Sequence, residues 1–133
     1  MRSTTILCSF CLLLVFAYAC KTRTNNAETK IMGHEEKFDF DINALDKDGL
    51  IGPASGKVSV DYKFCIPKGK KYEKAVLDID SEIKIHPNSF GRNKCSDTYV
   101  TAVGSTHQPG HREILLRLSE LDFVVRFNRV WYE

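Results

Sequence analysis

Apolar and polar residues alternate along the chain from Val58 to Cys65, with an apolar side chain at every second position. This pattern predicts a half-buried strand, which ends at Pro67. From Tyr72 to Ile79 the apolar residues instead recur at positions i, i+3, i+4 and i+7. That spacing predicts an amphipathic helix of about three turns. The first elements of the folded part are therefore a strand followed by a helix.

Two further strands joined by a turn are predicted next. Ile83 and Ile85 alternate with polar residues in a short strand that stops before Pro87. Residues 88–91 have the composition of a turn, and residues 98–104 are typical of a third strand. This pair of strands follows the helix without a second helical segment between them.

The C-terminal part predicts a second helix and a last strand. Pro109 suits the first position of a helix, and apolar residues follow on one helical face as far as Leu121. Residues 123–127 alternate again and predict a strand that continues toward residue 132.

Residues 57–133 thus follow the order strand–helix–strand–strand–helix–strand. With right-handed crossovers, two such halves give a four-stranded antiparallel sheet in the order 4-1-3-2, with both helices on one face. The predicted class is α+β, and the predicted arrangement is ferredoxin-like, βαββαβ. In that arrangement Cys65 and Cys95 fall at the same place on the sheet, which favours a structural disulfide.

Residues 20–56 differ from the rest and predict a flexible tether. Their first part has no apolar periodicity, although residues 38–42 alternate and are compatible with a short strand or a docking segment. Residues 21–56 hold 5 Lys and Arg against 7 Asp and Glu, whereas residues 57–133 hold 13 against 10. We therefore expect the compact domain to span residues 57–133. The acidic stretch that ends at 46–49 lacks ligands of a calcium loop and predicts a turn.

The first nineteen residues predict a signal peptide. Arg2 precedes an apolar run from Ile6 to Ala17, which is too short to span a bilayer. The sequence Ala17-Tyr18-Ala19 then stands directly before Cys20 and resembles the cleavage site of bacterial lipoproteins. The resemblance covers residues 1–20 and implies that Cys20 is lipidated and becomes the mature N-terminus. Family members usually have Leu where Ala17 stands, and plain cleavage after Ala19 would leave a soluble secreted chain.

The number of cysteines agrees with an acylated Cys20. Cys8 and Cys11 leave with the leader, so the mature chain retains three of the five cysteines. Acylation of one leaves Cys65 and Cys95 as a pair, in a compartment that permits disulfides. We accordingly expect an exported protein held at the cell envelope by its lipid.

Composition excludes several classes of protein. The chain has 133 residues, which allows one domain, and 43% of them are hydrophobic, which is too many for a disordered chain. Its net charge is only +2, so nucleic-acid binding is not expected. No cofactor-binding or metal-binding motif is present. His107 and His111 are four residues apart, but Pro109 and Gly110 separate them and a third ligand is lacking.

Two groups of polar residues are candidates for chemistry. The first surrounds the start of the second helix, where free N–H groups and the helix dipole attract anions. Its members, which could hold a carboxylate, phosphate or sulfate, are Ser105, Thr106, His107, His111 and Arg112. The alternative is that Thr106 or Gln108 only caps this helix.

The second group is a basic edge. The predicted topology brings its members together around Cys65 and Cys95, where they could attract an acidic partner or lower the pKa of a thiol. They are Lys68, Lys70, Lys71, His86, Arg92 and Lys94. The alternative is a solvated set of loops that keeps the domain soluble.

The sequence therefore favours a non-enzymatic binding or accessory domain that recognises a partner protein of the envelope or a small anionic ligand. No nucleophile motif or phosphate loop is present. The alternative function is a small enzyme or a redox domain. It would use His107 and His111 as acid and base, or exchange thiol and disulfide at Cys65 and Cys95.

Overall fold

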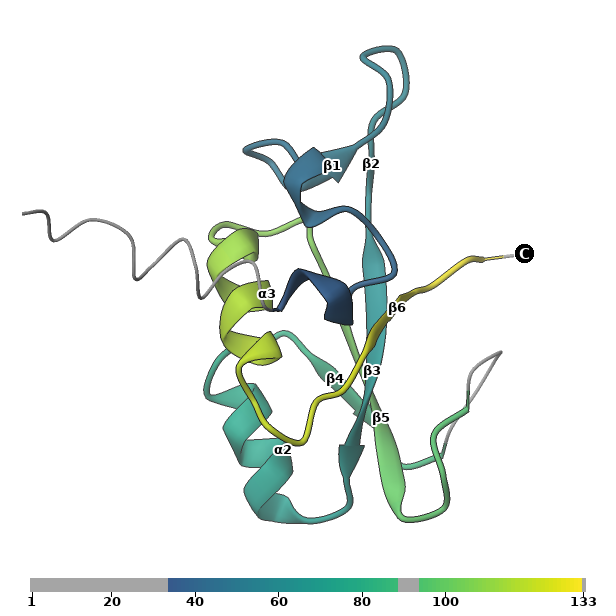
Figure 1. The fold of residues 1–133 in the computed structure, drawn as a ribbon, viewed down its shortest axis with the longest axis vertical. Helices are drawn as coiled ribbons and strands as arrows, with labels where there is room; N and C mark the ends of the chain where they lie inside the picture. Colours follow the sequence, from purple (N-terminus) through teal and green to yellow (C-terminus); the bar gives the residue numbers. More distant parts are fainter. Residues whose placement is uncertain (1–33, 89–93, 133) are drawn as a thin grey trace, which may run out of the picture.

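The computed structural model describes residues 34–88 and 94–132, and these residues form a mixed α/β fold. They hold two α-helices, a four-stranded antiparallel sheet and a separate two-stranded sheet (Figure 1). The elements are two short 3-10 helices, η1 (Glu35–Lys37) and η2 (Ile42–Ala44), then β1 (Leu50–Ile51), β2 (Val58–Ser59), β3 (Asp61–Pro67), α2 (Lys70–Leu77), β4 (Lys84–His86), β5 (Tyr99–Ser105), α3 (His111–Ser119) and β6 (Phe127–Arg129).

The larger sheet has the strand order β4-β5-β3-β6, and every neighbouring pair is antiparallel. The central pair is the longest, with β3 and β5 in register from Asp61 opposite Ser105 to Pro67 opposite Tyr99. The strands and helices expected from residue 57 onward are therefore confirmed as a mixed fold with two helices and four antiparallel strands.

The two faces of this sheet differ in character. Tyr62, Phe64 and Ile66 of β3 are at most 1% exposed. They belong to one apolar cluster with Val76 of α2 and with Leu115 and Leu118 of α3. Both helices lie on the same side of the sheet (Figure 1). Because side chains alternate along a strand, Asp61, Lys63 and Cys65 point to the opposite side, which we call the far face. The register adds further residues to the far face, namely Lys84 and His86 of β4, Thr101, Val103 and Ser105 of β5, and Asn128 of β6.

The segment before β1 is part of the core. Phe38, Ile42 and Leu45 are 8%, 3% and 6% exposed and belong to the same apolar cluster as the sheet. Phe38 forms a parallel bridge with Phe127, and their rings stack with centroids 4.5 Å apart. Lys37 donates hydrogen bonds to the carbonyls of Ser119 and Val124, at 2.7 and 2.8 Å. These contacts fix the segment to the end of α3 and to the outer side of β6.

Residues 38–51 thus pack against the folded part, within the segment that the sequence assigned to a tether, and the alternation at 38–42, compatible with a docking segment, includes the bridge of Phe38 to Phe127. Phe38, Ile42 and Leu45 are spaced i, i+4 and i+7, as on one face of a helix, but the segment folds as 3-10 turns and irregular chain that present them to the core. Residues 50–51 also pair with residues 58–59 in the small sheet. The predicted signal peptide and the first part of the predicted tether lie outside the described residues. No helix within residues 34–88 and 94–132 is long and apolar enough to cross a membrane.

The C-terminal elements are shorter than predicted. Helix α3 begins at His111 instead of Pro109, because Gly110 precedes it in the left-handed conformation, with φ +72°. Strand β6 comprises only residues 127–129, since Val124 closes a turn on Leu121. Val124 is fully buried and Val125 is 77% exposed, so the alternation that suggested a strand here belongs to a turn.

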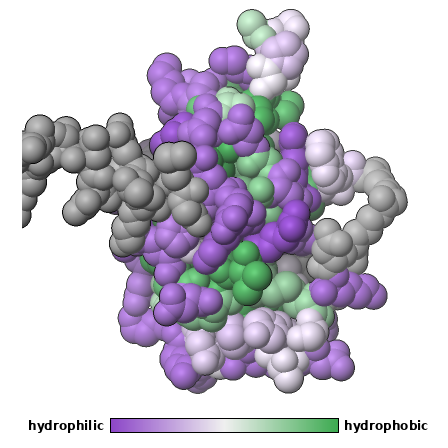
Figure 2. All heavy atoms as spheres, viewed as in Figure 1, coloured by the Kyte–Doolittle hydropathy of each residue, from purple (hydrophilic) through white to green (hydrophobic). Residues whose placement is uncertain are grey.

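Hydrophilic residues cover most of the side of the molecule that Figure 2 shows, with smaller apolar areas between them. The exposed large apolar residues include Val58, Val125, Trp131 and Tyr132. The two aromatic residues follow β6 directly, at the described end of the chain.

Candidate functional site

Three of the five residues predicted to bind an anion at the start of α3 are held by the protein itself. Thr106 is fully buried, and its hydroxyl donates to the carbonyl of Gly49 and accepts from the amide of Val60. Arg112 donates to the side-chain oxygen of Asn43 and to the carbonyl of Ile42, both at 3.1 Å.

His111 is the third, because it is only 6% exposed and its Nδ1 lies 3.3 Å from the carbonyl of Gln108. The residue that caps α3 is Gly110, with no side-chain hydrogen bond, so the expectation of a cap from Thr106 or Gln108 is wrong. The polar residues here mainly join the N-terminal segment and the preceding loop to α3.

Ser105 and His107 point elsewhere, into a groove of about 520 Å³ at one end of the far face. Its floor includes Val103 and Ser105, and His107 and Gln108 stand at one end. The full lining is Asp61, Glu82, Lys84, His86, Val103, Gly104, Ser105, His107, Gln108, Val130 and Tyr132. The groove thus brings Ser105 and His107 from the first predicted group together with His86 from the second.

A buried carboxylate shapes the end of the groove. Asp80 is 5% exposed, and its oxygens accept from the side-chain amide of Gln108 at 2.8 Å and from the backbone amide of Glu82 at 2.9 Å. Gln108 also donates to the carbonyl of Ser105 at 2.9 Å. Asp80 therefore holds the loop before α3 against the turn before β4, and both segments line the groove.

Gly104 lets the floor of the groove approach the core closely. A Cβ at this position would lie 2.6 Å from the hydroxyl of Tyr62, which runs beneath it. That hydroxyl is buried and has no hydrogen-bond partner among the described residues. Burial, and secondarily the charge of Asp80, raises the pKa of Tyr62 far above its ordinary value, so the phenol stays neutral.

The chain after β6 forms the opposite wall. The amide of Val130 donates to the carbonyl of Asp61, and the hydroxyl of Tyr132 donates to the carboxylate of the same residue, both at 2.8 Å. The hydrogen bond to Asp61 raises the pKa of Tyr132. Trp131 and Tyr132 are nevertheless 72% and 77% exposed, and the guanidinium of Arg129 lies 4.1 Å from the centre of the Trp131 ring.

The structure describes five of the six members of the predicted basic edge. Lys68, Lys70 and Lys71 are exposed around the start of α2, and the Lys71 ammonium lies over the ring of Tyr72. His86 lines the groove, whereas Lys94 lies at a second depression. Arg92, the sixth predicted member, lies outside the described residues.

Cys65 and Cys95 are joined by a disulfide, with their Cα atoms 5.6 Å apart. Cys65 lies on the far face and lines the second depression, of about 510 Å³, together with Asp39, Lys94, Arg126 and Asn128. The structure therefore confirms the predicted pairing.

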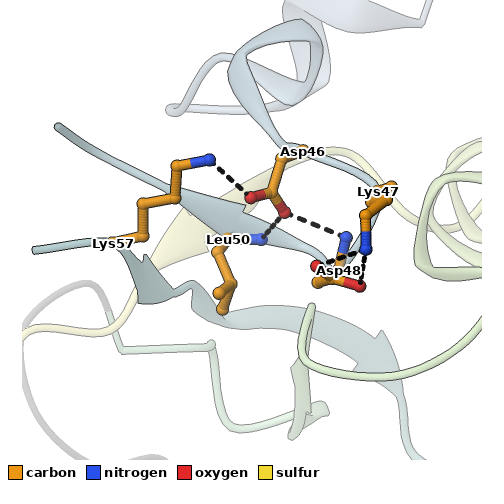
Figure 3. Close-up of polar contacts among 5 residues, drawn as sticks. All are labelled: Asp46, Lys47, Asp48, Leu50 and Lys57. Atoms are coloured by element: carbon orange, nitrogen blue, oxygen red, sulfur yellow. Dashed lines mark hydrogen bonds and ion pairs between the residues drawn. The ribbon is translucent and has the colours of Figure 1, made fainter. Parts of the chain in front are cut away.

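Metal-binding groups of three or more His, Cys, Asp or Glu side chains are absent from residues 34–88 and 94–132. The acidic stretch before β1 forms a turn, in which Asp46 accepts from the amides of Asp48 and Leu50 and from the Lys57 ammonium (Figure 3). These contacts, that of Lys57 above all, lower the pKa of Asp46 to about 2. The carboxylate serves the turn, as the sequence predicted.

Sequence reasoning did not select Asp61, Lys84, Val103 or Tyr132 as site residues. The alternation of apolar and polar residues along a strand indicates which side chains face away from the core. The register between strands was needed to show that they meet. Comparison of the chain with protein-family models, with curated proteins and with solved structures finds no match.

Proposed function

We propose that this chain is an exported, lipid-anchored binding domain that holds a segment of a partner protein in the groove on its far face. The observation that carries the proposal is the exposed aromatic side chain of Tyr132, which lines the groove. Tryptophan, tyrosine and arginine are the residue types that most often supply binding energy at protein interfaces. Trp131, with Arg129 stacked on its ring, adjoins Tyr132 in the chain but does not line the groove.

The charge of the groove favours a protein segment over a small anion. Lys84, His86 and His107 can carry positive charge, but Asp61 and Glu82 line the same groove. A small anion would lie close to at least one carboxylate, whereas a longer segment can place different groups against each. Small ligands are also usually enclosed by their pockets, and the aromatic wall of this groove is open to solvent.

Two further parts of the proposal concern fold and location. The strand order β4-β5-β3-β6, with α2 and α3 as the connections, supports assignment to the ferredoxin-like arrangement. The disulfide supports export, because such bonds persist in oxidising compartments. The leader, which resembles that of bacterial lipoproteins, supports the anchor at Cys20.

The enzyme alternative that uses two histidines is less well supported. His107 lines the groove, whereas the Nδ1 of His111 is directed to the carbonyl of Gln108 and its ring is buried. A bound molecule in the groove would therefore meet only one of the two proposed acid–base groups.

The binding proposal is tested with a library of random peptides displayed on phage and selected on the intact chain. We expect selected peptides to lose at least about tenfold in affinity with Tyr132→Ala, as is typical of interface hot spots. Val125→Ala is the matched control, because Val125 is also 77% exposed but does not line the groove. Peptides that bind the Tyr132→Ala variant as well as the unchanged chain would overturn the proposal.

The anchor is tested separately by the intact mass of protein taken from its native membrane. We expect a chain that begins at Cys20 and carries additional acyl mass. An unmodified chain that begins at the same residue would show plain secretion and remove the anchor from the proposal.

A further inference from the structure

The second depression on the far face places a disulfide beside two cations. Its lining comprises Asp39, Cys65, Lys94, Arg126 and Asn128. Lys94 and Arg126 are exposed, and neither forms an ion pair with another described residue. The Asp39 carboxylate is the opposing charge, and it accepts a hydrogen bond from the amide of Arg129 at 2.7 Å. The charged groups at the depression therefore sum to one net positive charge.

We propose that this depression is a site of thiol–disulfide exchange for small anionic thiols, with attack at the Sγ of Cys65. Cys65 lines the depression and Cys95 does not, so a thiol that enters the depression is expected to attack at Cys65. The two cations attract an anionic thiol and favour its reactive thiolate form. The proposal does not depend on the peptide groove, which has a different lining.

The leaving group is the sulfur of Cys95. The attacking thiol gives its proton to solvent, and its thiolate forms a bond to the Sγ of Cys65. The bond between Cys65 and Cys95 breaks, and its electron pair stays on the Sγ of Cys95 as a thiolate. One disulfide is exchanged for another, so the step itself needs no oxidant or reductant.

Thr101 is placed to assist this departure. Its hydroxyl oxygen lies 3.4 Å from the Sγ of Cys95. Once Cys95 is a thiolate, the hydroxyl can donate to it, and a hydrogen bond to the charged form stabilises that form. A leaving thiol of lower pKa departs faster. The product carries the small thiol on Cys65 and has lost the covalent link between β3 and the chain before β5.

The test uses two small thiols of opposite charge, 2-mercaptoethanesulfonate and cysteamine, on the folded chain at low salt. Alkylation with iodoacetamide traps the released cysteine, and intact mass with peptide mapping gives the rate and the position of the adduct. Lys94→Gln combined with Arg126→Gln removes both cations. The control is Lys70→Gln, an exposed lysine at the start of α2 that lines neither the groove nor this depression.

We expect the adduct on Cys65 and the alkyl group on Cys95. The ratio of the sulfonate rate to the cysteamine rate should fall by about three- to tenfold in the double variant and by less than about twofold in the control. A Thr101→Val variant should react more slowly with both thiols. An adduct on Cys95, a rate ratio that the double variant does not change, or exchange that requires denaturant would each overturn the proposal.

Discussion

The hydroxyl of Thr106 donates a hydrogen bond of 2.6 Å to the carbonyl of Gly49, which lies 57 residues earlier in the chain. The same hydroxyl accepts from the amide of Val60 at 2.8 Å. Gly49 is itself buried, with φ +75°, and a Cβ there would overlap the carbonyl of Thr106. One side chain thus joins the turn before β1, the start of β3 and the end of β5.

Replacement of Thr106 by valine keeps its shape and removes both hydrogen bonds. Because the freed groups of Gly49 and Val60 remain buried, we expect a loss of about 1–3 kcal/mol in the free energy of unfolding. Thr106→Ser is the control, since it keeps the hydroxyl. Hydrogen exchange distinguishes the two, because the Val60 amide should lose protection in the valine variant only. A protected Val60 amide in Thr106→Val would contradict this account.

Removal of the N-terminal segment tests where the compact unit begins. A chain that starts at Lys57 lacks Phe38, Ile42 and Leu45, each buried and each worth about 1.5–3 kcal/mol. That sum is comparable to the whole stability of a typical domain. We expect no cooperative unfolding transition in urea for this chain, and a normal one for a chain that starts at His34.

Phe38→Ala in the full chain provides a milder form of the same test. The ring stacks on Phe127, so its loss should destabilise by about 3–5 kcal/mol. A fully stable chain from Lys57 onward, together with a neutral Phe38→Ala, would restore the sequence-based boundary near residue 56.

Acid should weaken the turn at Asp46. Its pKa is about 2 in the folded protein and 3.8 as the ordinary value, so folding favours the carboxylate. The stabilisation of the folded protein by the Asp46 carboxylate is fully present above pH 3.8 and is lost as the pH falls toward 2. Urea midpoints measured from pH 5 to pH 2 should therefore fall less steeply for Asp46→Asn than for the unchanged chain. Asp97→Asn, at an exposed position in the turn before β5, is the control and should retain the steep fall.

The disulfide should contribute substantially to stability. Cys65 and Cys95 are 30 residues apart, and closure of such a loop is worth about 3–4 kcal/mol in the chain-entropy model. Urea unfolding of the Cys65→Ala, Cys95→Ala double variant should show this loss, and the unchanged chain under a strong reductant should match it. If the free energy of unfolding of the double variant were less than about 1 kcal/mol below that of the unchanged chain, the loop would already be restricted in the unfolded chain.

The candidate site was only partly predictable from the sequence. Ser105, His107 and His86 were selected as polar residues without a packing role, and all three line the groove. Thr106 and Arg112 were selected on the same grounds, but they bind the segment around residues 42–49. Sequence reasoning had placed that segment in a tether, so it offered no partner for them.

The sequence by itself determined the kind and order of the main elements from β3 onward. Strand and helix periods are local properties, because they depend on how successive side chains point from one backbone. It also determined the pairing of Cys65 with Cys95, once the other cysteines were assigned to the leader and its cleavage site. These inferences required no knowledge of which distant residues meet.

Only the tertiary structure decided where the core begins and where the groove lies. Phe38, Ile42 and Leu45 enter the core through 3-10 turns and irregular chain, although their spacing of i, i+4 and i+7 is that of a helix, so the local period does not reveal how they are buried. The groove depends on the register of β4 with β5 and on the path of the chain after β6. The start of the core and the position of the groove both depend on packing between segments that are distant in sequence. This packing also decides which polar side chains form hydrogen bonds within the protein and which face solvent.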